Sequence, residues 1–271
     1  MTQSKVQLRN IIKVFGAHPD KAVALLEQGM PKQEAQKASG SNIGLAGVSA
    51  EFKAGEISCI MGLSGSGKST LIRHINRLID PTSGELMVDG ENILDLSLDQ
   101  LREFRRRKMS MVFQSFALLP HLTVHENVAF GLMVRHDDAK QAAAQASLWI
   151  ENVGLVGYEH QYPDELSGGM RQRVGLARAL ATDAEILLMD EAFSALDPLI
   201  RYEMQDQLLS LQSNLQKTVI FVTHDIDEAL RLGQHIVILR DGLVEQAGSP
   251  AQIVENPNNE YVEHFIARRQ R

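Results

Sequence analysis

One nine-residue stretch constrains this chain more than any other, and it reads Gly62-Leu63-Ser64-Gly65-Ser66-Gly67-Lys68-Ser69-Thr70. It fits the pattern G-x-x-x-x-G-K-[S/T], whose glycines let backbone N–H groups approach an anion without a Cβ in the way. An apolar run over 56–61 precedes it, and apolar residues recur at helical spacing over 71–78. A strand, a glycine loop and a helix N-terminus in this order favour phosphate. The flanks therefore argue against an ordinary glycine-rich turn.

Two side chains of this stretch predict the bound species. The Lys68 ammonium can reach the β- and γ-phosphates, and the Ser69 hydroxyl can ligate Mg²⁺, which prefers oxygen. The stretch alone predicts binding of a nucleoside triphosphate, without indicating its use.

The bulk composition limits the function classes. The 271 residues are 44% hydrophobic with a net charge of −7, which suits a large α/β domain and disfavours nucleic-acid binding. No apolar run approaches the roughly 20 residues needed to cross a bilayer, and no signal peptide is recognisable at the start. We expect a cytosolic protein, or one held at a membrane by a partner. The single Cys59 permits no internal disulfide.

Strands alternate with helices along most of the chain, which predicts a mostly parallel sheet. We treat 1–271 as a single domain with two helical additions: an insertion at 17–42 and a helical subdomain at 115–165. The alternative for the insertion is a solvated surface decoration. Strands are predicted at 5–15 (one or two), 43–53, 56–61, 85–88, 109–114, 185–190, 218–223, 235–239 and 243–246. Further helices are predicted at 98–108, 174–181, 199–215 and 226–232.

Three of these strands end in polar residues, at the sheet edge where ligands bind. Asp190 and Glu191 follow an apolar run; Asp190 is placed to hold Mg²⁺, and Glu191 to polarise a water for attack on the γ-phosphate. Gln114 can contact both the Mg²⁺ and that water. His224 follows another strand. The alternatives are a surface acidic pair for the carboxylates and a capping or core histidine for His224.

A second anion site is predicted at Ser167-Gly168-Gly169, ahead of a helix rich in Ala and Leu. Two phosphate sites that face apart cannot hold one triphosphate. A two-fold homodimer resolves this, because the second site of one copy can cover the nucleotide of the other. The alternative is a simple helix cap.

In combination these motifs resemble, in order and over nearly the whole chain, the ATP-binding cassette (ABC) ATPases, a P-loop NTPase family. The resemblance implies an α/β fold with a mostly parallel core sheet, an antiparallel β subdomain and a helical subdomain. It implies ATP and Mg²⁺ as cofactors, and it implies the following roles. Phe15 stacks on adenine; Gly62 to Thr70 are the Walker A loop; Gln114 is the Q-loop; Ser167 to Gly169 are the signature acting in trans; Asp190 and Glu191 are Walker B and the catalytic base; Asp197 is the D-loop; and His224 is the switch histidine. Met170 replaces the usual signature Gln.

The stretches 25–29, 60–65, 113–118 and 190–201 resemble more narrowly the glycine betaine/proline-type importers. This implies import of a quaternary amine, betaine, choline, proline or histidine. The implied partners are an integral-membrane permease and a solute-binding protein. The chain would then attach peripherally at the cytoplasmic face of the cell membrane. Longer members carry CBS regulatory domains; because this chain ends at Arg271, we expect that regulation to be absent.

Two alternatives have a different use for the nucleotide. A soluble ABC ATPase acting on nucleic acid or ribosomes usually joins two cassettes or carries long coiled coils, and an ordinary phosphate-loop kinase has no use for Ser167–Gly169. We predict a permease-docking groove at 114–120, with Phe116, Leu118 and Leu119; its alternative is core packing of the helical subdomain.

Overall fold

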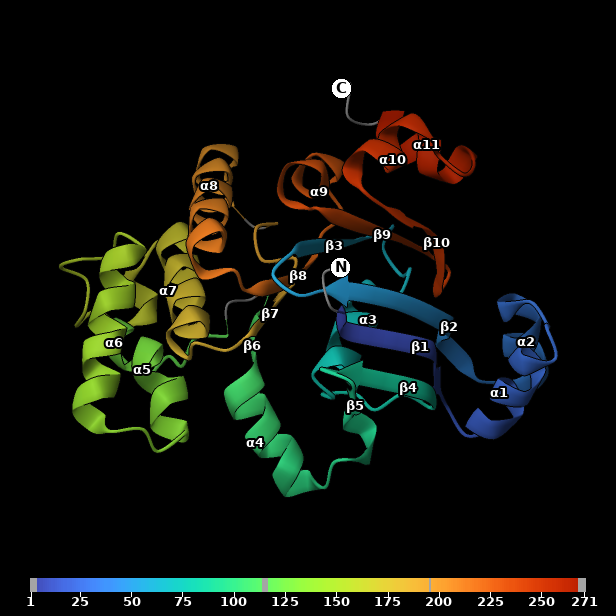
Figure 1. The fold of residues 1–271 in the computed structure, drawn as a ribbon, viewed down its shortest axis with the longest axis horizontal. Coiled ribbons are helices and arrows are strands. Elements are labelled where there is room, and N and C mark those ends of the chain that lie inside the picture. The colour runs from blue at the N-terminus through green and yellow to red at the C-terminus, as the bar shows by residue number, and fades with distance from the viewer. Residues whose placement is uncertain (1–3, 114–116, 195, 268–271) are drawn as a thin grey trace. The chain divides into compact units, whose positions relative to one another are not determined.

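The two ends of the chain together build one unit, residues 1–97 and 220–271, and the middle, residues 98–219, builds another. The structure is a computed structural model that describes residues 4–113, 117–194 and 196–267. The chain passes from the second unit to the first within strand β8 (Thr218–Val222). Each unit is described by itself (Figure 1).

The first unit contains a four-stranded antiparallel sheet in the order β2-β1-β4-β5. A single strand, β1 (Ser4–Phe15), pairs on one side with β2 (Asn42–Lys53) and on the other with β4 (Ser83–Val88), which is followed by the short β5 (Glu91–Asn92). Alternation of apolar and polar residues puts one face of the sheet into the core, where Val6 pairs with Phe52 and with Val88.

The predicted insertion at 17–42 contains two short helices, α1 (Pro19–Glu27) and α2 (Lys32–Ser39). Figure 1 shows both at the end of the β1–β2 ribbon. Ala22 and Ala35 are fully buried against Ile12, Val14 and Ile43 of the sheet. An apolar seam therefore fixes the insertion, although its outer face is solvated.

A second group of strands in the first unit carries the glycine loop. Strand β3 (Ile57–Met61) runs parallel to β9 (His235–Arg240), and β9 pairs antiparallel with β10 (Leu243–Gly248). The helices of this part are α3 (Lys68–Ile75), α9 (Ile226–Leu232), α10 (Pro250–Glu255) and α11 (Glu260–Ala267), with a 3-10 turn at Ile93–Asp95.

The second unit combines a parallel strand pair with helices. Strand β6 (Met109–Val112) pairs in parallel with β7 (Ile186–Asp190). The helices are α4 (Leu98–Lys108), α5 (Val124–Val134), α6 (Ala139–Asn152), α7 (Gly168–Ala181) and α8 (Pro198–Leu215), with a 3-10 turn at Pro163–Glu165. Figure 1 shows α5, α6 and α7 packed together, and α6 buries the predicted apolar face of Ala142, Ala146, Trp149 and Ile150.

The structure corrects the predicted bounds at a few places. Helix α7 begins at Gly168, six residues before the predicted 174, because Ser167 caps it. Helices α10 and α11 were not predicted, since the chain beyond 246 lacks a long periodic pattern. In the part of the chain that the structure describes, no helix is both long and apolar enough to cross a membrane.

Candidate functional site: a phosphate loop and a capped helix

The glycine loop takes the conformation that its sequence predicts. Strand β3 is wholly buried and ends at Met61, and the loop leads into α3. Gly62, Gly65 and Gly67 have φ angles of +151°, +80° and +105°, a region that L side chains rarely adopt. Because α3 begins at Lys68, its first N–H groups and its positive dipole end lie directly after the loop.

Gly62 is the tightest point of the loop. A Cβ built there would lie 2.4 Å from the Leu239 carbonyl oxygen of β9 and 2.4 Å from the Ser66 Oγ. At Gly65 a Cβ would meet no atom within 4 Å, so that side of the loop faces open space. The loop thus packs closely against the sheet at Gly62 and faces open space at Gly65. This arrangement leaves room for a phosphate within the loop.

The Lys68 side chain folds back over this loop. It is only 6% exposed, and its Nζ donates to the Gly62 carbonyl oxygen at 2.9 Å and to that of Leu63 at 3.3 Å. These bonds hold a full positive charge at the loop, where a phosphate would be bound.

The β9–β10 turn supports the loop from outside it. The Gly242 N–H donates to the Ser66 carbonyl at 3.0 Å, and the Gly242 carbonyl accepts from the Ala46 N–H at 2.8 Å. Lys32 of the insertion lies against the same turn, since a Cβ on Gly242 would be 3.2 Å from its Nζ. Burial lowers the pKa of Lys32, and the Asp241 carboxylate opposes that shift.

Phe15, the predicted adenine platform, ends β1 and is 41% exposed. Its ring lies against Gly44 of β2, where a Cβ would come within 2.9 Å of the Phe15 Cε2. The Lys13 Nζ lies 5.2 Å from the ring centroid. An aromatic ring backed by glycine and partly open to solvent suits stacking with a base.

His224 is exposed on a segment whose neighbours are firmly held. The Thr223 N–H donates to the Ile60 carbonyl at 3.1 Å, and its hydroxyl donates to the buried Glu228 carboxylate. The Asp225 N–H donates to the Thr223 Oγ1 at 3.0 Å, and the Asp225 carboxylate caps α9. These contacts hold the backbone on both sides of His224.

The second unit holds the acidic pair. Asp190 is the last residue of the buried strand β7 and is 4% exposed. Glu191 follows with a φ of +48°, an uncommon value for a residue with a side chain. Its carbonyl accepts from the Ser194 N–H at 3.2 Å and from the Ser194 Oγ at 2.9 Å. A tight turn therefore directs the chain away from the strand immediately after Asp190.

The same unit holds the predicted second anion site. Ser167 caps α7, and its Oγ accepts from the Met170 N–H at 3.3 Å. A Cβ on Gly168 would meet no atom within 4 Å, whereas one on Gly169 would lie 3.0 Å from the Ile200 Cγ2, so this 14-residue helix is open at Gly168. Asp197 is exposed at the N-terminus of α8, where its side chain makes no capping hydrogen bond.

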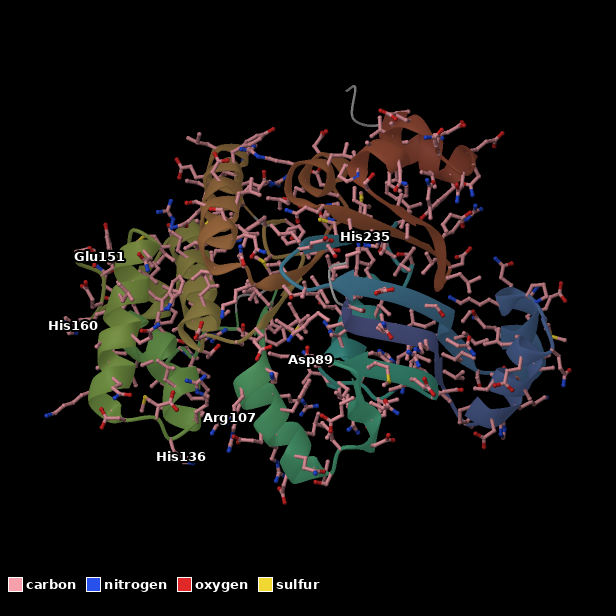
Figure 2. The ribbon with its side chains drawn as sticks, in the orientation of Figure 1. Asp89, Arg107, His136, Glu151, His160 and His235 are labelled. Carbon is pink, nitrogen blue, oxygen red and sulfur yellow. The ribbon has the colours of Figure 1, made fainter. Side chains whose placement is uncertain are left out.

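The predicted site residues divide between the two units. Phe15, the loop 62–70 and His224 belong to the first; Ser167–Gly169, Asp190, Glu191 and Asp197 belong to the second. Gln114 lies outside the described residues, as does Phe116 of the predicted groove. No group of three or more His, Cys, Asp or Glu in the described ranges could hold a metal; Figure 2 labels His136, His160 and His235 on three separate segments.

Sequence reasoning missed three residues around the loop: Gly242, Lys32 and Tyr261. The Asp241-Gly242 dipeptide between the predicted strands 235–239 and 243–246 is typical of a hairpin turn, but it does not indicate that the turn bonds to the phosphate loop. No sequence pattern around Lys32 or Tyr261 marks them, because each contacts the loop or its supporting turn from a distant part of the chain.

The collision at Gly62 gives a stability prediction. We expect Gly62→Ala to lower the free energy of unfolding by about 2–4 kcal/mol, since backbone strain and overpacking act together. Gly90→Ala is the matched control, because Gly90 has a φ of +82° but open space around it, and it should cost about 1–2 kcal/mol. Urea unfolding of both variants measures the difference; equal losses would contradict the close approach.

The sequence of this chain matches a known protein family and several of its members. The family model described as "ABC transporter" matches residues 45–194. The glycine betaine transport ATP-binding protein OpuAA of Bacillus subtilis is 56% identical over 97% of this chain and 63% of its own length. The glycine betaine/proline betaine transport system ATP-binding protein ProV of Escherichia coli is 52% identical over 97% of this chain and 66% of its length. This chain thus spans just under two thirds of either relative.

A solved structure agrees with the sequence comparison. A dimeric ATP-binding cassette in a post-hydrolysis state with ADP and Pi matches 90% of this chain and 98% of its own, with 34% identity and a TM-score of 0.76. The predicted α/β fold class, with parallel strand pairs, an antiparallel sheet and helices, is confirmed. The chain belongs to the ABC transporter family.

Proposed function

We propose that this chain is the ATP-hydrolysing subunit of a membrane importer for a quaternary amine, betaine or related amino acid. One observation carries the proposal: a phosphate loop with a buried lysine and a second open helix N-terminus occur in a chain 56% identical to a glycine betaine transport ATP-binding protein. Neither relative described above is named for nucleic acid, and a net charge of −7 gives nucleic acid no attraction.

The binding step uses residues of the first unit. Phe15 offers its ring to the adenine, and the loop from Gly62 to Thr70 surrounds the phosphates with backbone N–H groups. Lys68 exchanges its two carbonyl partners for the β- and γ-phosphates, which are stronger acceptors because they are charged.

The hydrolytic step adds carboxylate, amide and imidazole groups. Ser69, Gln114 and Asp190 supply oxygen ligands suited to Mg²⁺, which would neutralise charge on the phosphates. Glu191 orients a water for in-line attack and accepts its proton, and His224 contacts the γ-phosphate. The strained backbone at Glu191 is the kind of feature that active sites retain.

A homodimer completes the site. The open N-terminus of α7 supplies the N–H groups of Ser167–Gly169 to the nucleotide held by the other copy, and Asp197 lies at the same interface. The dimeric state of the solved cassette supports this arrangement. ATP drives transport only because it binds the closed dimer more tightly than the open one.

The catalytic assignment is tested at Glu191. We expect Glu191→Gln to lower ATP turnover by about 10²–10³ because the amide cannot accept the proton from water, while the ATP-bound dimer persists. Steady-state phosphate release and size-exclusion chromatography with Mg·ATP measure the two effects. Lys68→Ala is the comparison variant, since it should weaken nucleotide binding itself. Wild-type turnover in Glu191→Gln would remove it from the role of base.

A groove in the second unit is our candidate for docking an integral-membrane permease. It has a volume of about 390 Å³ and an apolar wall that includes Phe113, Leu119, Phe130 and Val134. Phe130 and Val134 are 39% and 37% exposed, so the groove offers large apolar groups to a partner. A permease helix fits this chemistry, and docking there would hold the chain at the cytoplasmic face of the cell membrane.

Two polar side chains of the helices, one buried and one partly buried, bond to the chain beside the groove. The Asn127 amide, fully buried on α5, donates to the Leu119 carbonyl at 3.1 Å and accepts from the Leu119 N–H at 2.9 Å. Arg178 donates to the Ala117 carbonyl at 2.8 Å, and burial lowers the pKa of this arginine. Ala117 and Leu119 are therefore held by α5 and α7 before any partner binds.

The docking assignment predicts a separable defect. Phe130→Ser should reduce co-purification with the permease by at least about tenfold, since burial of a large aromatic ring supplies 1.5–3 kcal/mol, and should leave basal ATP hydrolysis unchanged. Leu148→Ser is the matched control, because Leu148 is 48% exposed on α6 of the same unit and does not line the groove. Equal co-purification of the two variants would exclude the groove.

In the proposed importer a partner protein, rather than this chain, binds the solute. We expect the solute-binding protein of the same system to bind one of glycine betaine, proline betaine, choline, proline or histidine. Titration of the purified binding protein with each solute measures this, and D-glucose serves as the negative control. Binding of none of them would contradict the substrate class while leaving the ATPase assignment in place.

A further inference from the structure

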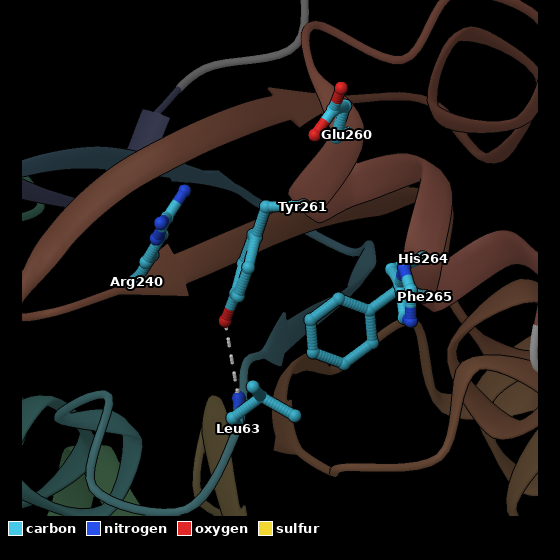
Figure 3. A pocket seen from close by; sticks show the side chains of 6 residues that line it. All are labelled: Leu63, Arg240, Glu260, Tyr261, His264 and Phe265. Atoms are coloured by element: carbon cyan, nitrogen blue, oxygen red, sulfur yellow. Dashed lines mark hydrogen bonds between the residues drawn. The ribbon is translucent and has the colours of Figure 1, made fainter.

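The last described helix touches the phosphate loop through one hydroxyl group. Tyr261 of α11 accepts a hydrogen bond from the Leu63 N–H at 3.4 Å and donates one to the Leu239 carbonyl at 3.1 Å. Figure 3 shows the ring pointing from α11 to the Leu63 nitrogen. One side chain outside the family motifs therefore joins the loop to strand β9.

Both partners of the hydroxyl lie at the tightest point of the loop. The Leu239 oxygen is the atom that a Cβ on Gly62 would approach to 2.4 Å, and Leu63 is the next residue after Gly62. Leu63 is 44% exposed, so its side chain does little to anchor it. The Tyr261 hydroxyl thus bridges the two chain segments whose spacing sets where the loop begins.

The ring that carries the hydroxyl is held in place. The Arg240 guanidinium lies 4.7 Å from its centroid, and Phe265 packs edge-on at 5.2 Å. The Asn259 Oδ1 accepts from the N–H groups of Tyr261 and Val262, which caps the start of α11. Burial raises the pKa of the Tyr261 phenol, so the hydroxyl keeps its proton at neutral pH and donates to Leu239.

Dense packing does not account for this contact. The region holds a cavity of about 310 Å³, lined by Leu63, Arg240, Glu260, Tyr261, His264 and Phe265. The six residues surround this space in Figure 3. The ring therefore stands beside a cavity, and its hydroxyl bonds to the loop at the edge of that space.

We propose that Tyr261 is a positioning residue of the phosphate-binding loop, through which helix α11 sets the affinity of the chain for ATP. The inference rests on the proposed function, since it assigns a use to the same loop. Its effect falls on binding rather than on hydrolysis, because the hydroxyl bonds to backbone groups at the start of the loop and in β9 and not to Glu191 or His224. The position of α11 is thereby coupled to nucleotide affinity.

The test removes the hydroxyl and nothing else. Tyr261→Phe removes both hydrogen bonds of the hydroxyl, of which the one from the Leu63 N–H holds the loop itself. In the full chain we expect it to raise the Kd for Mg·ATP, measured by calorimetry, and the KM for ATP about fivefold, the factor expected for the loss of that one bond to the loop. The kcat should stay within about twofold, because both lost bonds lie away from the reacting atoms. An unchanged Kd with a lower thermal midpoint would overturn the proposal and leave Tyr261 as a structural anchor.

Val262→Ala is the matched control, since Val262 is fully buried on the same helix and has no polar side-chain atom. It should lower stability and leave the Kd unchanged; an equal rise in Kd would overturn the proposal. Amide hydrogen exchange over residues 57–68 gives a readout without nucleotide and should be faster in Tyr261→Phe alone. A wild-type chain that binds no Mg·ATP would contradict the proposed function, whereas the exchange result would still decide whether Tyr261 braces the loop.

Discussion

The close approach of Gly62 to the Leu239 carbonyl is the constraint on which the rest of the site depends. Strand β3 delivers the loop at this point, and β9 lies beside it in parallel register, so no side chain fits between them. The loop then turns through residues with positive φ until Lys68 starts α3. The Lys68 ammonium donates to the Gly62 carbonyl, so the position of Gly62 against β9 also sets the position of that positive charge.

Much of this could be predicted because the signals are local. Helices at 98–108 and 226–232 have the predicted bounds, since apolar spacing and flanking residues lie within one window of sequence. The glycine loop was equally readable, because positive φ angles require glycine at fixed positions. The start of α7 was placed too late, because its Ala- and Leu-rich part is the clearer helical signal and a cap at Ser167–Gly169 was only the alternative to an anion site.

The supports of the site could not be predicted, because they join distant parts of the chain. Leu63 and Tyr261 are 198 residues apart, and no periodicity or motif connects them. The Gly242 N–H reaches Ser66 only because β9 and β10 fold back beside β3. Lys32 comes from the helical insertion, for which the sequence indicated no contact with the phosphate loop. The groups that contact a ligand are thus more visible in sequence than the groups that hold them.

Ligand-contacting groups and their supports differ in how strongly they restrict the sequence. Contacts to phosphate restrict residue type at consecutive positions, whereas a backbone N–H or carbonyl can be supported by any polar side chain or backbone group that reaches it. The Gly242 turn and the Tyr261 hydroxyl are both of this second kind. They approach the loop from the β9–β10 hairpin and from α11, which lie outside the shared motifs. Elements at this edge of the unit can therefore adjust nucleotide affinity without any change in the residues that meet the phosphates.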